Sequence, residues 1–74
     1  MAKLAEYVNG HYRVENTNGS HRFTINDKHN RIGRDEVEVM DWGSGSGATI
    51  LADFDNLAQA IAFVEGLIGE PIEN

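Results

Sequence analysis

The sequence predicts an α+β fold, an antiparallel sheet of about five strands with one C-terminal helix packed on one face. Three observations predict this class. Two Asn-Gly pairs, at 9–10 and 18–19, lie between segments in which apolar and polar residues alternate. A further alternating segment follows at 36–42, and residues 48–54 form another expected strand. Residues 55–68 then show the apolar spacing of an amphipathic helix.

The two Asn-Gly pairs predict a three-stranded meander, with strands at residues 3–8, 11–16 and 20–26. Asn-Gly favours the two-residue type I′ turn, in which both central residues have positive φ. Such turns would place Glu6 opposite Arg13 on one face of the sheet. They would also place Glu15 opposite Arg22 on that face. The apolar side chains fall on the other face, which we expect to meet the core: Ala5, Tyr7, Tyr12, Val14, Phe23 and Ile25.

The two later strands predict a hairpin that follows a polar loop at residues 27–34. The Gly/Ser-rich residues 43–47 would connect the two strands. A short connection of this kind places Val39 near Ile50 on the core side of the sheet. The opposite side of the hairpin then combines acidic and apolar side chains: Glu36, Glu38, Met40, Trp42, Leu51 and Asp53.

The helix has a clear start and end in the sequence. Asp55 or Asn56 can accept a backbone N–H as the N-cap. Gly66 or Gly69 can supply the C-cap, and Pro71 prevents further helix. The core-facing stripe is Leu57, Ala60, Ile61, Val64, Leu67 and Ile68, widened by Phe63. We therefore expect one domain over residues 1–74, with the sheet at 3–54, the helix at 55–68 and a loose tail at 70–74.

Composition limits the possible functions. The 74 residues carry a formal net charge of −6 and include no cysteine, which excludes disulfides and thiolate metal sites. No apolar run approaches the roughly 18 residues of a membrane helix, and we expect a cytoplasmic protein without membrane contact. Residues 1–34 contain six basic and three acidic residues, whereas 35–74 contain nine acidic residues and neither Lys nor Arg. Some acidic surface must therefore remain after the halves meet.

The residues do not predict catalysis, a cofactor or a metal. The predicted register puts His11 and His21 on opposite faces of the sheet, so the imidazoles do not converge on one ion. The glycine-rich connection lacks the Lys that follows a phosphate-binding loop, and a strand rather than a helix comes after it. The paired carboxylates Glu36 and Glu38 form a solvated row more simply than an acid–base pair. We expect no enzymatic activity.

The feature that favours a function is the mixed face of the later hairpin. Met and Trp inside an acidic patch are typical of protein-binding surfaces, although Trp42 could instead pack into the core. We expect a non-enzymatic protein, a monomer or small homo-oligomer, that presents this acidic surface to a basic site on a partner protein. The expected partner-binding residues are Glu36, Glu38, Met40, Asp41, Trp42, Leu51 and Asp53.

Short segments of the chain resemble a family of phage-encoded inhibitors. Tyr7-Val8-Asn9-Gly10, Arg13-Val14-Glu15-Asn16 and Asp53-Phe54-Asp55 are similar to pieces of small anti-CRISPR proteins that act on type I systems. The resemblance implies a sheet-then-helix plan and a stoichiometric inhibitor of a nucleic-acid-handling defence complex. It assigns no functional residue.

The alternative function is a sheet-based nucleic-acid-binding module. Its cations would come from the basic loop, where Lys28, Arg31 and Arg34 cluster. Three cations form a small phosphate footprint, and the nine carboxylates that follow would repel a duplex. We therefore expect no tight binding to DNA or RNA at physiological salt.

Overall fold

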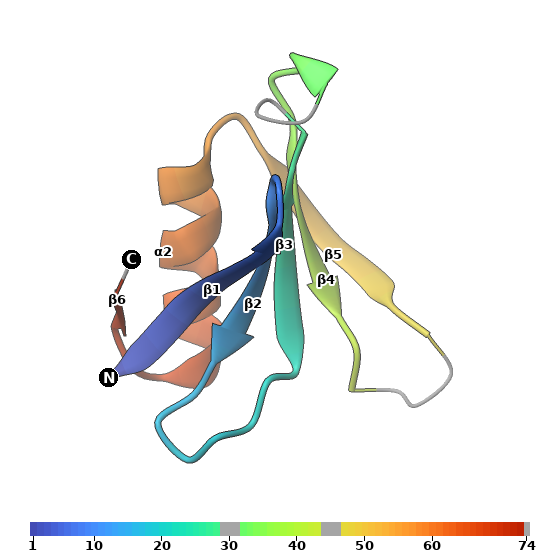
Figure 1. Ribbon diagram of the computed structural model, residues 1–74. Helices are drawn as coiled ribbons and strands as arrows, with labels where there is room; N and C mark the ends of the chain where they lie inside the picture. The colour runs from blue at the N-terminus through green and yellow to red at the C-terminus, as the bar shows by residue number, and fades with distance from the viewer. Residues whose placement is uncertain (29–31, 44–46, 74) are drawn as a thin grey trace.

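The computed structural model describes residues 1–28, 32–43 and 47–73. It confirms the α+β class, because a mostly antiparallel open sheet carries one C-terminal helix, α2, on one face (Figure 1). The described sheet has six strands rather than about five, in the order β5-β4-β3-β2-β1-β6. The elements are β1 (Ala2–Val8), β2 (His11–Glu15), β3 (Phe23–Asp27), β4 (Val37–Asp41), β5 (Thr49–Phe54), α2 (Leu57–Ile68) and β6 (Ile72–Glu73).

The first hairpin contains a β-bulge that the sequence did not predict. Val8 lies opposite His11, but the register then shifts across Tyr7. The predicted Glu6–Arg13 pair is therefore wrong, and Arg13 lies opposite Ala5. A shift of one residue exchanges the two faces of a strand. As a result Leu4, rather than Tyr7, packs against the core, and Tyr7 is exposed.

Both Asn-Gly pairs lie at turns, but the turns are not type I′. Among the described residues only glycines have positive φ, with Gly10 at 80° and Gly19 at 89°. The Gly19 N–H donates to the Asn16 carbonyl at 2.9 Å, so Thr17 and Asn18 are the central residues of that turn. A turn followed by a left-handed glycine is the usual three-residue hairpin connection. Where β2 and β3 pair, the register is nevertheless the predicted one, because Arg13 lies opposite Thr24 as a register with Glu15 opposite Arg22 requires; the pairing ends before Glu15 and Arg22 themselves.

The β4–β5 pairing differs from the predicted one by two residues near the core. Val39 lies opposite Ala52 rather than Ile50, and Val37 lies opposite Phe54. A shift of two residues leaves each side chain on its predicted face. A second bulge then follows, so that Met40 pairs with Ile50.

The helix is bounded by two capping residues that were among the predicted candidates. Asn56 is the N-cap, and its side-chain Oδ1 accepts the Gln59 N–H at 2.9 Å. Gly69 is the C-cap with φ 73°, and its N–H donates to the Glu65 carbonyl at 3.0 Å. In the described part of the chain, no helix is both long and apolar enough to cross a membrane.

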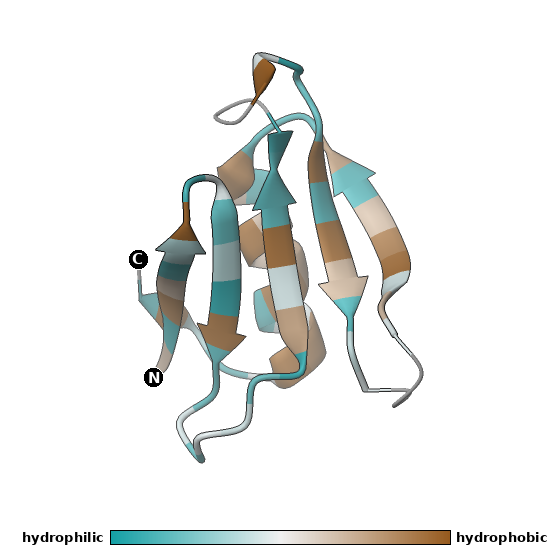
Figure 2. Ribbon diagram, turned by 45° about the vertical axis from the view of Figure 1, so that its right-hand side comes forward, coloured by the Kyte–Doolittle hydropathy of each residue, from teal (hydrophilic) through white to brown (hydrophobic). Residues whose placement is uncertain are grey.

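The core lies between α2 and the covered face of the sheet. Ala60, Ile61 and Val64 are the buried helix residues, and the Phe63 and Phe54 rings lie 5.2 Å apart. The sheet contributes Ala2, Val14, Ile25, Val37, Val39 and Ile72. The predicted stripe is wrong at one position, because Leu67 is 46% exposed. The opposite face of the sheet, here called the outer face, is not covered by the helix (Figure 2).

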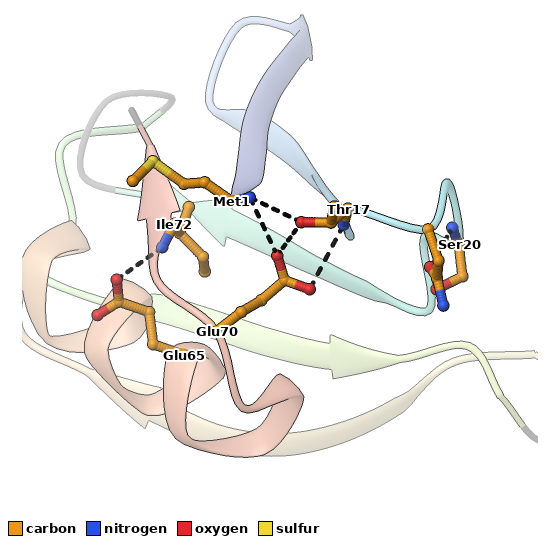
Figure 3. A network of polar contacts seen from close by, with 7 residues as sticks. Met1, Thr17, Ser20, Glu65, Glu70 and Ile72 are labelled. Carbon is orange, nitrogen blue, oxygen red and sulfur yellow. Dashed lines mark hydrogen bonds and ion pairs between the residues drawn. The ribbon is translucent and has the colours of Figure 1, made fainter.

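The segment expected to be a loose tail is anchored to the sheet. Ile72 is buried and pairs in parallel with Ala2 of β1. Its backbone N–H donates to Glu65 Oε2 at 2.7 Å. The Glu70 carboxylate accepts hydrogen bonds from the Thr17 side chain and backbone, and it lies 3.7 Å from the amino group of Met1 (Figure 3). These contacts convert the tail into the sixth strand.

A pair of helix substitutions measures how much the core contributes. Ile61→Ala should lower the free energy of unfolding by about 2–5 kcal/mol, because it removes a buried side chain and leaves a cavity. Leu67→Ala removes a similar volume from an exposed position and should cost about 1 kcal/mol or less. Urea unfolding followed by circular dichroism gives both values. Equal losses in the two variants would contradict the observed packing of α2.

Candidate functional site

The outer face carries large apolar side chains that nothing in the described fold covers. Tyr7 is 55% exposed, Trp42 48%, Ile50 56% and Leu51 40%. Trp42 follows β4, and Ile50 and Leu51 come from β5, where the bulge lies. Tyr7 comes from the bulge of β1. An exposed apolar group on one open sheet face is typical of an interaction surface.

Three carboxylates converge on the outer face near the open end of the β4–β5 hairpin, away from its connecting loop. Glu38 lies opposite Asp53, and one carboxylate oxygen from each of Glu36, Glu38 and Asp53 lies within 4.8 Å of the others. We call these three residues the acidic corner. Lys28 Nζ lies 3.3 Å from Glu36 and 3.3 Å from Glu38, and Asn26 Nδ2 donates to Glu38 at 3.2 Å. The corner thus carries more negative than positive charge.

The acidic corner already attracts one cation. Partial burial works against the charged form of Lys28, but hydrogen bonds to Glu36 and Glu38 raise its pKa above the ordinary value. Three carboxylates at this spacing could also supply oxygen ligands to a divalent ion, and the Lys28 ammonium supplies positive charge at the same place. The arrangement is suited to binding Lys or Arg side chains from another molecule.

The Trp42 side chain is held in a fixed orientation on the surface. Its indole N–H donates to Thr24 Oγ1 at 2.7 Å, and its backbone N–H donates to the Arg22 carbonyl at 2.9 Å. Thr24 is buried in the middle of the sheet, so the indole lies across β3. Trp42 is therefore a surface residue rather than a core residue, and its side chain is ordered in advance of any contact.

Arg22 and Asp41 form a two-point ion pair next to Trp42. Arg22 Nε and Nη2 donate to the two Asp41 oxygens at 2.7 and 2.8 Å, and the Gly43 N–H donates to Asp41 at 2.8 Å. A Cβ at Gly43 would lie 2.3 Å from Arg22 Nε, so any other residue at this position would require the Arg22 side chain to move. The predicted Glu15–Arg22 pair is wrong, because Glu15 instead accepts from Arg13 at 3.1 Å.

A concave region of about 660 Å³ lies on the outer face between the two exposed aromatic residues. We call it the outer cleft, and its lining residues are Tyr7, Arg13, His21, Arg22, Thr24, Trp42 and Gly43. The charged lining residues are the two arginines, and the lining includes no carboxylate. His21 and His11 were expected on opposite faces. In fact His21 lines this cleft, and His11, two residues from Arg13, lies 5.9 Å from the Tyr7 ring.

The structure groups most of the predicted partner-binding residues. Glu36, Glu38 and Asp53 form the acidic corner, whereas Asp41 sits at the far end of β4 with Arg22. Met40, Leu51 and Trp42 accompany them, with Met40 only partly exposed. Sequence reasoning missed Tyr7 and Ile50, because both positions depend on bulges.

The basic loop of the alternative function is largely engaged by carboxylates. Lys28 pairs with Glu36 and Glu38, and Arg34 Nη2 lies 4.0 Å from Glu36. Arg31 lies outside the described residues. Lys28 is thus part of the acidic corner rather than of a separate basic surface.

No protein-family model matches the chain, and neither a curated protein nor a solved structure matches it significantly.

The Arg22–Asp41 pair can be tested through the acidity of its carboxyl group. Hydrogen bonds from Arg22, and then from the Gly43 backbone, lower the pKa of Asp41 below its ordinary value of 3.8. Because the folded pKa is lowered, the pair stabilises the fold above pH 3.8, and this stabilisation is lost as the pH falls through the folded pKa. Carboxyl ¹³C NMR should show Asp41 titrating below 3.8. Arg22→Ala should raise that pKa, and an unchanged titration would contradict the pairing.

Proposed function

We propose that this protein is a non-enzymatic binding protein whose outer face meets a basic site on a partner protein. The observation that supports this most directly is that the acidic corner and the exposed, oriented indole of Trp42 lie at the two ends of β4, on the same sheet face that the helix leaves open. Arg or Lys side chains of the partner would approach Glu36, Glu38 and Asp53. Apolar contact at Trp42, Ile50 and Leu51 would exclude water around these ion pairs.

The resemblance to type I anti-CRISPR proteins suggests which class of protein the partner belongs to. We propose that the partner is a nucleic-acid-binding subunit of a defence complex, since such subunits expose basic grooves to their own ligand. An acidic protein bound in that groove would block the binding of nucleic acid, because its carboxylates would pair with the same basic side chains that bind the phosphates. This mechanism needs no catalytic group and acts with one inhibitor per site.

The acidic corner and the indole should affect different steps of binding. Glu36→Lys combined with Glu38→Lys should slow association and weaken its salt dependence, because charge pairs mainly steer the encounter. Trp42→Ala should mainly speed dissociation, because it removes buried apolar contact. Biolayer interferometry with the purified partner separates the two rates. Glu73→Lys, on the other edge strand, makes one such charge reversal far from the acidic corner and should change neither rate appreciably.

Two results would contradict this site. If neither the 36/38 variant nor Trp42→Ala altered partner binding, the outer face would not be the interface. Submicromolar binding of random duplex DNA at about 0.15 M salt, lost on changing Arg31 and Arg34, would support the alternative function instead.

The inhibitor proposal has its own test in cells. The chain should restore plaque formation by a phage that a host type I CRISPR complex targets, and the 36/38 variant should not. The host without its CRISPR complex gives the reference plaque number, and immunoblotting confirms equal expression. Unchanged plaque numbers across hosts of the type I subtypes would reject the inhibitor role and leave the general binding proposal standing.

A further inference from the structure

The outer face carries two zones of opposite character. The acidic corner lies at one end of β4 and β5, where Glu38 pairs with Asp53. The outer cleft lies toward β2, β3 and the other end of β4, and its lining presents Arg13 and Arg22, each already paired with one carboxylate, Glu15 and Asp41 respectively. Met40, which lies opposite Thr24 at the edge of the cleft, lies between the two zones. The carboxylates of one copy of such a face could therefore contact the arginines of the same face on a second copy.

The arginines of the outer cleft are held in place while keeping donors to spare. Arg22 uses Nε and Nη2 for Asp41, and its guanidinium lies 5.4 Å from the Phe23 ring centroid. Arg13 bonds Glu15 through Nη2. A guanidinium has five N–H donors, so both groups can still receive a carboxylate from another molecule. Their orientation costs little on binding because it already exists in the single chain.

From this arrangement we infer that two copies of the chain associate face to face through their outer faces. The acidic corner of each copy enters the outer cleft of the other. A twofold axis in the interface, passing near Thr24 and Met40, relates the two contacts, since such an axis exchanges zones on either side of it. Each copy then supplies both a carboxylate group and an arginine group. The apolar residues Tyr7, Trp42, Ile50 and Leu51 lie within the same contact.

The dimensions of the molecule are sufficient for such a dimer. The principal extents are 34, 28 and 21 Å, and the shortest fits one sheet and one helix layer. The two longer extents bound the broad face at roughly 950 Å², so a standard stable interface of about 800 Å² from each partner would use most of it. Pairing two such faces gives a four-layer assembly in which both sheets are covered on both sides.

The dimer goes beyond the proposed function, because in the dimer a second copy of the chain, rather than the partner protein, covers the outer face. A partner protein would have to compete with the second copy for the acidic corner. The two proposals can fail independently, since self-association is measured with the purified chain alone.

Sedimentation equilibrium tests self-association directly. It should be run at about 0.15 M salt, where a screening length of about 8 Å limits the repulsion between two chains of net charge −6. Between ~1 μM and ~1 mM the mass should rise from 8.2 kDa to twice that value. Trp42 fluorescence should shift to shorter wavelength over the same range. A chain that stays monomeric throughout overturns the inference.

Charge exchange tests the geometry of the dimer. Arg13→Glu and Asp53→Arg should each weaken dimerisation at least about tenfold, because each puts like charges together twice in a symmetric dimer. An equimolar mixture of the two variants should dimerise again, since one contact is then native and the other has both charges exchanged. Asp53 is exposed and lies opposite Glu38, so an arginine there can pair across the strands and the fold is retained.

Arg34→Glu makes the same change in net charge as Arg13→Glu, but it removes a cation that lies 4.0 Å from Glu36 of the acidic corner. It should therefore strengthen dimerisation, whereas an effect of net charge alone would weaken it as Arg13→Glu does. Circular dichroism confirms that every variant is folded before it is mixed. Dimerisation of both single variants at the native strength, or a mixture of folded variants that stays monomeric, overturns the proposed contact.

Discussion

One helix can cover only one face of a sheet, and the arrangement of this molecule follows from that constraint. Ala60, Ile61 and Val64 bury the covered face, and the short helix has no second apolar stripe for another layer. The sheet therefore keeps a face whose residues were not selected by packing against the rest of the chain. Polar rows, two arginines and several large apolar side chains can all lie there without cost to the core.

The covered face was the most predictable part of the fold. Apolar spacing and capping residues define α2, and Asn56 and Gly69 act as their side-chain and backbone chemistry requires. Alternation also placed Glu36, Glu38 and Asp53 on one face, because a register error of two residues does not change the side on which a residue lies. Both results depend on local periodicity, which a single sequence records directly.

The bulges account for most of what the sequence did not predict. A bulge adds one residue to one strand, and nothing in the alternation at Tyr7 or Leu51 distinguishes the extra residue from its neighbours. Each bulge moved one large apolar side chain to the outer face, Tyr7 in β1 and Ile50 in β5. The partners of Arg13 and Arg22 changed for a related reason, since Arg22 lies just before β3 and reaches Asp41 instead of its expected neighbour in β2. Long side chains at strand ends have several carboxylates within reach, and only tertiary geometry selects one.

The pairing of β6 with β1 has a consequence for how the sheet forms. Ala2 lies beside Ile72, so this contact closes nearly the whole chain into a loop. Contacts of high sequence separation tend to form late, because chain entropy is lost before they contribute any stability. Until the segment around Glu70 and Ile72 arrives, the edge of β1 has unpaired backbone groups, which are available to strands of other molecules. Completion of folding thus pairs the start of this edge at Ala2 and Lys3, whereas the rest of β1 and the strand β5 remain at the two edges of the described sheet.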